Sequence, residues 1–152
     1  MVTLEDAESN PEEYLGRDIM LTSLNDISIG TNDDFAIIFY ENNLKQAIID
    51  RLRTAQGELT LHPNYGSRLH ELLGANSTDD TLVWARMFTR EALLQEPRIE
   101  KILSVTAEYK EESMGEVIEI SINVQPIQDL DKLNMVFSLF LTGDGTLLTE
   151  VK

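Results

Sequence analysis

The hydrophobic pattern of this chain changes period once, from helical spacing in the middle to alternation in the last third. Apolar residues recur at intervals of three and four within 44–54 and 79–96, which predicts two helices. Apolar and polar residues then alternate within 103–109, 118–124 and 133–141, which predicts three strands. Elements segregated in this way indicate an α+β fold, with helices in the middle of the chain packed on a small antiparallel sheet.

Short polar residues, glycines and prolines set the ends of the predicted helices. A helix of one or two turns over 68–73 is expected between the two longer ones, and it ends at Gly74. Pro97 ends the long helix at Glu96, because the residue before a proline avoids helical backbone angles. The predicted N-terminal caps of the three helices are Asn43, Ser67, and Thr78 or Asp79.

The helix predicted within 79–96 carries two apolar stripes. The first stripe has Leu82, Ala85, Phe88 and Ala92. The second stripe has Val83, Met87 and Leu94. An apolar arc this wide predicts a helix that is buried from two sides.

Two apolar runs before the helices, 18–21 and 35–40, predict short strands or edge segments. In the last predicted strand, Val136 and Phe140 add apolar groups on the face opposite to the main run. We therefore expect that strand to be central in the sheet, or covered on both faces.

The length of 152 residues fits one domain, and no repeat or linker divides the chain. We expect an acidic arm over 1–17 and a single domain over 18–152. No apolar run approaches the ~20 residues that a membrane helix needs, and the amino terminus is acidic where a secretory signal is basic. These features predict a soluble protein that is used without export.

The formal net charge is -15, and it is concentrated at the two ends of the chain. Residues 1–41 carry one basic and ten acidic residues, 42–101 carry eight of each, and 102–152 carry three basic and nine acidic. This balance excludes nucleic acid and anionic membranes as partners, because both need Lys and Arg on the protein. Two interpretations remain open: a solvated acidic surface, or acidic ends that dock on a basic partner.

No motif in the chain predicts catalysis, a metal site or a cofactor. The absence of cysteine excludes disulfides, thiolate metal sites and a cysteine nucleophile. The run HELLG at 70–74 begins like a zinc-binding helix, but Gly74 stands where the second histidine ligand is required. Pairs of carboxylates are abundant by chance in so acidic a chain, so none of them predicts a hydrolase site.

A series of short motifs across the middle of the chain points instead to an assembly protein. The series comprises Gln46, Thr54 with Gly-Glu at 57–58, PNYGSRLHELL at 63–73, and EPRI at 96–99. In this order the motifs resemble the baseplate wedge and sheath-initiator family of contractile tails, which includes the lysozyme-like wedge proteins of contractile phages and relatives in type VI secretion baseplates. The likeness covers about residues 18–141.

The resemblance implies a non-enzymatic structural protein with a fold like the interlocking domain of tail sheath proteins. Its expected partners are baseplate wedge proteins and the tail sheath protein, with tail tube and hub proteins as further candidates. Its expected place is the baseplate of a virion tail assembled in the host cytoplasm, or the cytoplasmic baseplate of a phage-derived injection system. It is expected to initiate the sheath by strand pairing through 102–152. A small acidic adaptor and a peptidoglycan glycosidase remain as alternatives.

The same resemblance implies which residues bind partners. Glu96, Pro97 and Arg98 form a rigid corner at the end of the long helix, and the family likeness implies that this corner grips the helical core bundle of the wedge. Gln46, Glu58 and Tyr65 complete the expected partner-binding set. Two alternatives stay open: Glu96 and Arg98 pair with neighbours inside the domain, and Tyr65 with Gly66 only shapes a turn. Leu59 follows Glu58 where many family members have arginine.

Overall fold

The computed structural model describes residues 14–22, 26–112, 115–140 and 149–151, and it confirms the α+β prediction. Its contacts divide the chain into two compact units, Met1–Gln46 and Ala47–Lys152. The single domain predicted over 18–152, preceded by an arm, stays a prediction, and residues 1–13 of that arm lie outside the described residues.

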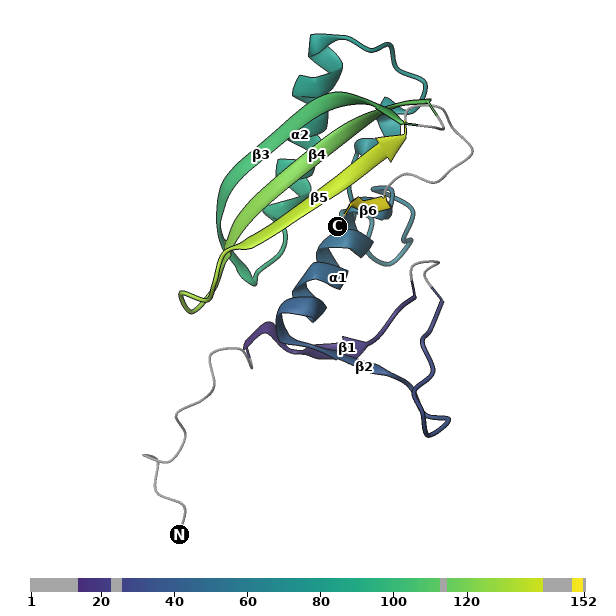
Figure 1. Ribbon diagram of the computed structural model, residues 1–152, viewed down its shortest axis with the longest axis vertical. Helices are drawn as coiled ribbons and strands as arrows, with labels where there is room; N and C mark the ends of the chain where they lie inside the picture. The colour runs from purple at the N-terminus through teal and green to yellow at the C-terminus, as the bar shows by residue number, and fades with distance from the viewer. Residues whose placement is uncertain (1–13, 23–25, 113–114, 141–148, 152) are drawn as a thin grey trace. The chain divides into compact units, whose positions relative to one another are not determined.

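The elements are β1 (Arg17–Ile19), β2 (Ile37–Phe39), α1 (Tyr40–Arg53), a 3₁₀ turn η2 (Leu69–Leu72), α2 (Asp79–Leu93), β3 (Ile99–Glu112), β4 (Gly115–Pro126), β5 (Leu133–Phe140) and β6 (Thr149–Val151) (Figure 1).

The first unit contains a two-stranded antiparallel ribbon. Strands β1 and β2 pair with Arg17 opposite Phe39 and Ile19 opposite Ile37, which confirms the two short strands expected near 18–21 and 35–40. Beyond β1 the ribbon continues in single bridges, Leu21 with Ile27 and Ile29 with Phe35. We use "the ribbon" for residues 17–22 and 26–39.

Helix α1 begins at Tyr40, which is earlier than the sequence predicts. Asn43 is therefore inside the helix, and its predicted role as the N-terminal cap is wrong. Its side chain is buried, and its Nδ2 donates a 2.8 Å hydrogen bond to the carbonyl of Leu15. An asparagine amide can satisfy a distant backbone carbonyl as well as a helix end, and sequence alone does not separate these two uses.

The second unit contains an antiparallel sheet with the strand order β3-β4-β5-β6 (Figure 1). Strand β4 pairs with β3 on one side and with β5 on the other, and Ile120 stands opposite Ala107 and Phe137. Strand β5 lies between β4 and β6, so the prediction that it is central is confirmed. The buried apolar residues of β4 and β5 are Val117, Ile118, Ile120, Ile122, Val124, Leu133, Met135, Phe137 and Leu139.

Helix α2 packs against the sheet, mainly on β3 (Figure 1). Its N-terminal cap is Thr78, as predicted, and the Thr78 side chain accepts a hydrogen bond from the backbone N–H of Thr81. The helix ends at Leu93, a turn before the predicted end at Glu96. Within the residues that the structure describes, no helix is long and apolar enough to cross a membrane.

Only one of the two apolar stripes of α2 is buried. Ala85, Phe88 and Ala92 of the first stripe are at most 3% exposed. Val83, Met87 and Leu94 of the second stripe are 48%, 37% and 71% exposed. The prediction that α2 is buried from two sides is therefore wrong, because the sheet covers only one side of the helix.

The segment between α1 and α2 folds back on the end of α1. Ser67 pairs with Ala55 in a parallel bridge, and the Ser67 N–H donates to the carbonyl of Thr54 at 2.9 Å. The predicted helix at 68–73 is a 3₁₀ turn over Leu69–Leu72. Its N-cap is Arg68, without a side-chain capping bond. Ser67 lies one residue before that position, so the prediction of Ser67 as the N-cap is wrong. Its hydroxyl donates to the carbonyl of Leu52 at 2.7 Å and accepts from the N–H of Leu69 at 3.4 Å.

Candidate functional site

Three of the six predicted site residues meet around an arginine that the sequence did not single out. Arg51 lies in the last turn of α1, and its guanidinium carbon is 4.4 Å from the centre of the Tyr65 ring. Arg51 Nη1 donates to Gln95 Oε1 at 3.2 Å, and Arg51 Nη2 is 3.5 Å from Glu96 Oε2. We call Arg51, Tyr65, Gln95, Glu96 and Arg98 the arginine corner.

Within this corner, the two charged residues of the Glu-Pro-Arg triplet pair with each other. Glu96 is 4% exposed, and its Oε1 accepts a 2.6 Å hydrogen bond from Arg98 Nε. The backbone N–H of Arg98 donates to the same oxygen at 3.3 Å. Pro97 is exposed at the bend between the two charged residues. The alternative in which Glu96 and Arg98 pair inside the domain therefore describes their contacts in this structure.

Burial and charge act in opposite directions on the corner carboxylate. Burial raises the pKa of Glu96, but the hydrogen bonds and charge of Arg98, with a smaller contribution from Arg51, outweigh burial and lower the pKa below 4.5. Burial also raises the pKa of the Tyr65 hydroxyl above 10.0, against the opposing charge of Arg51. The corner thus holds a buried glutamate in its charged form between two arginines.

Gln46 and Glu58 each make local contacts within their own unit. In the first unit, Gln46 Oε1 accepts from the N–H of Leu21, and its Nε2 donates to the carbonyl of Ile19, both at 2.9 Å. Gln46 therefore fastens the edge of β1 to the middle of α1. In the second unit, Glu58 Oε2 accepts from the N–H of Ala55 at 2.9 Å and closes a turn.

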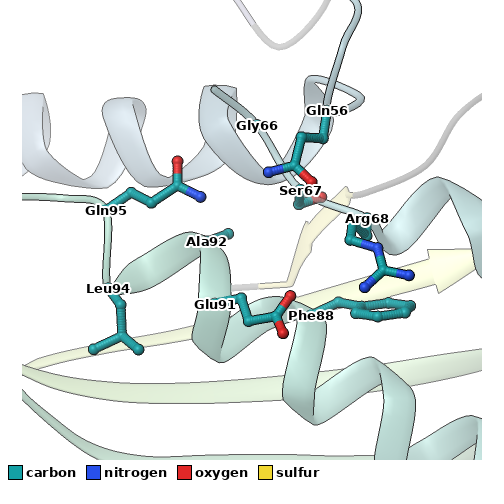
Figure 2. A pocket seen from close by; sticks show the side chains of 9 residues that line it. All are labelled: Gln56, Gly66, Ser67, Arg68, Phe88, Glu91, Ala92, Leu94 and Gln95. Carbon is teal, nitrogen blue, oxygen red and sulfur yellow. The ribbon is translucent and has the colours of Figure 1, made fainter. Parts of the chain in front are cut away.

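Two hollows adjoin the corner and share Gln95. One, of about 310 Å³, is shown in Figure 2, where Arg68 lies over the Phe88 ring and Leu94 points away from the other labelled side chains. The other, of about 370 Å³, is lined by Arg51, Leu61, His62, Pro63, Asn64, Tyr65 and Gln95. Leu61 is 88% exposed at its rim. Exposed leucines beside a rigid polar cluster are suited to protein contact.

The arrangement offers little to a metal ion or to hydrolytic chemistry. Among the described residues, no three His, Asp or Glu side chains gather in a group that could hold a metal. The hollow in Figure 2 is lined by one carboxylate, Glu91, and the second hollow by none. Glycoside hydrolysis uses two carboxyl groups that face each other across a cleft.

Sequence reasoning missed Arg51 and Gln95. A basic residue in the last turn of a helix is common, because it interacts favourably with the helix dipole, so Arg51 gave no distinct signal. The available signal was its spacing on α1, where Arg51 follows buried Leu44 and Ile48 by seven and three residues. That spacing places Arg51 beside the packed face of the helix.

Comparisons with known proteins agree with the motif series. A family model described as the sheath initiator of contractile injection systems matches residues 17–126. A crystal structure from Geobacter sulfurreducens, provisionally described as a tail lysozyme, is 30% identical and has a TM-score of 0.61. That match covers 68% of this chain and 93% of the other. No curated protein matches the sequence significantly. Because the family model spans more than half of the sequence, this chain belongs to the sheath-initiator family of contractile injection systems.

Proposed function

We propose that this protein is a non-enzymatic baseplate component that joins the wedge core to the tail sheath and starts sheath assembly by strand pairing. Membership of the family supports a role in sheath initiation. The contact with the wedge and the choice of the pairing strand are proposed here in addition. The observation that carries the proposal is the open outer edge of β2. Pairing through backbone hydrogen bonds needs an unpaired edge and little side-chain chemistry.

The hydrogen-bond pattern of the ribbon identifies that edge. The N–H of Tyr40 donates to Gly16, and the N–H of Met20 donates to Ala36, so even-numbered β2 residues face β1. The alternation therefore directs the N–H and C=O groups of Ile37 and Phe39 away from β1, toward the outer edge of β2. Among the described residues, no strand other than β1 pairs with β2 over 37–39.

The outer edge of β1 is different, because Gln46 already occupies it. The two Gln46 hydrogen bonds use the Leu21 N–H and the Ile19 carbonyl. The ribbon therefore offers one edge to an incoming strand rather than two. Exposed Ile37 and Phe39, at 44% and 46%, provide apolar contacts beside the open edge.

The C-terminal third, 102–152, offers weaker candidates for the pairing edge. Strand β5 already has β6 on its far side at 136–138, so that stretch is not free. Strand β3 has an outer edge but carries Lys101, Glu108 and Lys110, and its register shifts twice near its start. Charged residues and bulges are features by which edge strands avoid pairing with other chains. The β3 edge is the second candidate, and the proposal favours β2.

The arginine corner is the proposed contact with the wedge core. Glu96 pairs with both Arg98 and Arg51 and so fixes the shape of the corner, while the exposed groups beside it meet the partner. Pro97 and Leu61 are such groups. Leu61→Asp is therefore expected to block binding to wedge proteins while the melting temperature stays unchanged. Normal wedge binding by this variant would remove the proposed contact.

Proline substitution tests the pairing edge in a reconstituted baseplate. Phe39→Pro removes an N–H that faces outward, so the ribbon is expected to persist while sheath growth stops. Ile38→Pro is the matched control, because it removes an N–H that faces β1 and is expected to disrupt the ribbon itself. A proline scan over 103–109 tests β3 in the same assay. If folded Phe39→Pro still initiates sheath normally and a β3 variant does not, the pairing edge is β3.

A hydrolase is the second candidate, favoured only by the tail-lysozyme description of the Geobacter sulfurreducens structure. Turnover of peptidoglycan by the purified protein, lost on Glu91→Gln, would favour it over the structural role. We expect no turnover.

A further inference from the structure

The outward face of α2, together with its C-cap Leu94, carries an apolar row that the fold leaves uncovered. Val83, Met87 and Leu94 are 48%, 37% and 71% exposed, on the side of the helix opposite to buried Ala85 and Ala92. With Arg90, these residues stand at 83, 87, 90 and 94, which are intervals of four, three and four. We call these four residues the seam.

Intervals of four and three are the repeat by which two helices pack side by side. A strand or a flat surface does not match this repeat, because its side chains recur every two residues or without a period. From 83 to 94 the seam extends about 17 Å along the axis, or three helical turns. The geometry therefore suits a helix as the occupant.

Charged residues on the two flanks of the seam further restrict which kind of helix fits it. Arg86 lies beside the seam, and Arg90 lies within it. No described carboxylate is within ion-pair distance of either arginine, although the chain as a whole has a net charge of -15. The opposite flank carries Asp80 and Glu91, which are both exposed. An occupant that matches this pattern presents carboxylates to the arginines.

We propose that the seam is a docking site for an amphipathic helix of another protein, with an apolar stripe against Val83, Met87 and Leu94 and acidic residues against Arg86 and Arg90. If two copies of this chain packed seam to seam as an antiparallel two-fold dimer, the arginine flank of one copy would face the arginine flank of the other. The repulsion between these like charges disfavours such a dimer. This proposal does not depend on the β2 edge or on the arginine corner, so the failure of either of those proposals would leave it unchanged.

Trp84 is the only tryptophan in the chain and lies beside the seam, so its emission reports on docking. It is 47% exposed, and its ring centre is 5.7 Å from that of Phe88. The probe is a synthetic helical peptide with leucines at seam spacing and glutamates on the flank that meets the arginines. A second peptide has lysine in place of each glutamate. The glutamate peptide is expected to shift Trp84 emission to the blue and to bind at least about tenfold more tightly.

Paired variants separate the seam from general charge effects. Arg86→Glu with Arg90→Glu is expected to reverse the preference, so that the lysine peptide binds more tightly. Lys101→Glu with Lys110→Glu changes the net charge equally on β3 and is expected to keep the original preference. Met87→Asp is expected to abolish binding of both peptides, and its melting temperature checks that the exposed substitution leaves the fold intact.

Three results would overturn the proposal. The first is no emission shift with either peptide at about 1 mM, which leaves no useful affinity. The second is a dimer in solution that Met87→Asp dissociates, because a second copy would then occupy the seam. The third is peptide binding that appears only when residues 1–13 are removed, because that acidic segment of the chain would then be the occupant.

Discussion

At the scale of single residues, Gly66 shows how one position fixes the path of the chain beside the arginine corner. Its φ is +107°, and a Cβ added there would lie 2.4 Å from the carbonyl oxygen of Thr54. That carbonyl accepts the hydrogen bond of Ser67, so it is held in place. The turn at Tyr65 and Gly66 therefore needs glycine for both its backbone angle and its close approach.

Gly66→Ala is expected to lower the free energy of unfolding by about 3 kcal/mol, from backbone strain and the collision together. Gly57→Ala is the matched control, because Gly57 has a φ of +90° and no atom within 4 Å of an added Cβ. Strain alone predicts a loss of about 1 kcal/mol at Gly57. Chemical denaturation measures both variants, and equal losses would mean that the loop moves aside at little cost.

Glu96 gives a prediction on the dependence of stability on pH. The pKa of Glu96 is lowered in the folded state, so its charge stabilises the fold above about pH 4.5 and this contribution disappears as the pH falls through the lowered value. Glu96→Gln is therefore expected to cost about 2–3 kcal/mol at pH 7 and progressively less toward pH 3. Denaturation at several pH values measures this difference.

Exposed Glu100 is the control for Glu96, because it pairs with Lys101 at 3.6 Å on the surface. Glu100→Gln is expected to change stability by less than about 0.5 kcal/mol at any pH. A cost for Glu96→Gln that stays constant between pH 7 and pH 3 would contradict the proposed role of its charge.

At the scale of elements, the sequence predicted the kinds of element better than their surroundings. The change of hydrophobic period gave two helices and three strands, because each periodicity follows from local backbone geometry. It gave the wrong environment for Val83, Met87 and Leu94, because an apolar stripe reports what a helix is able to bury and not what covers it. The site was predicted in part for a similar reason: Glu96, Arg98 and Tyr65 meet, but Arg51 joins them through folding that no local pattern records.

Strand β4 provides the test of the predicted facing. Ile120 is 1% exposed, and Glu119 next to it lies 3.9 Å from Lys110 across the strands. Ile120→Asp is expected to unfold the protein, because it buries a carboxylate without a partner. Glu119→Lys is expected to cost about 1 kcal/mol or less, because it only replaces a surface pair by a like-charge contact. Circular dichroism separates the two outcomes, and equal tolerance of both changes would mean that the facing of β4 is wrong.

At the scale of the whole molecule, the net charge of -15 opposes folding through self-repulsion. Salt shortens the Debye length from about 30 Å at 0.01 M to about 3 Å at 1 M, while the buried Glu96 pair is screened much less. Raising the NaCl concentration from about 0.01 M to about 0.5 M is therefore expected to raise the melting temperature by about 2–4 °C, which corresponds to about 1 kcal/mol. A melting temperature that falls with salt would mean that attractive surface pairs outweigh the repulsion.

The division of the chain into two units leads to the last prediction, which rests on the proposed function. The β2 edge lies in Met1–Gln46, and the arginine corner lies in Ala47–Lys152. The two sites belong to separate compact units, so the effects of substitutions in them are expected to add. In a reconstituted baseplate, Phe39→Pro is expected to stop sheath growth while wedge binding stays normal, and Leu61→Asp is expected to prevent wedge binding.

Fusing the Leu61→Asp variant to a wedge protein is then expected to restore sheath growth, because the fusion replaces the lost wedge contact. The same fusion of the Phe39→Pro variant is expected to leave sheath growth blocked. If fusion rescues both variants equally, the ribbon acts in wedge attachment and not in pairing with the sheath.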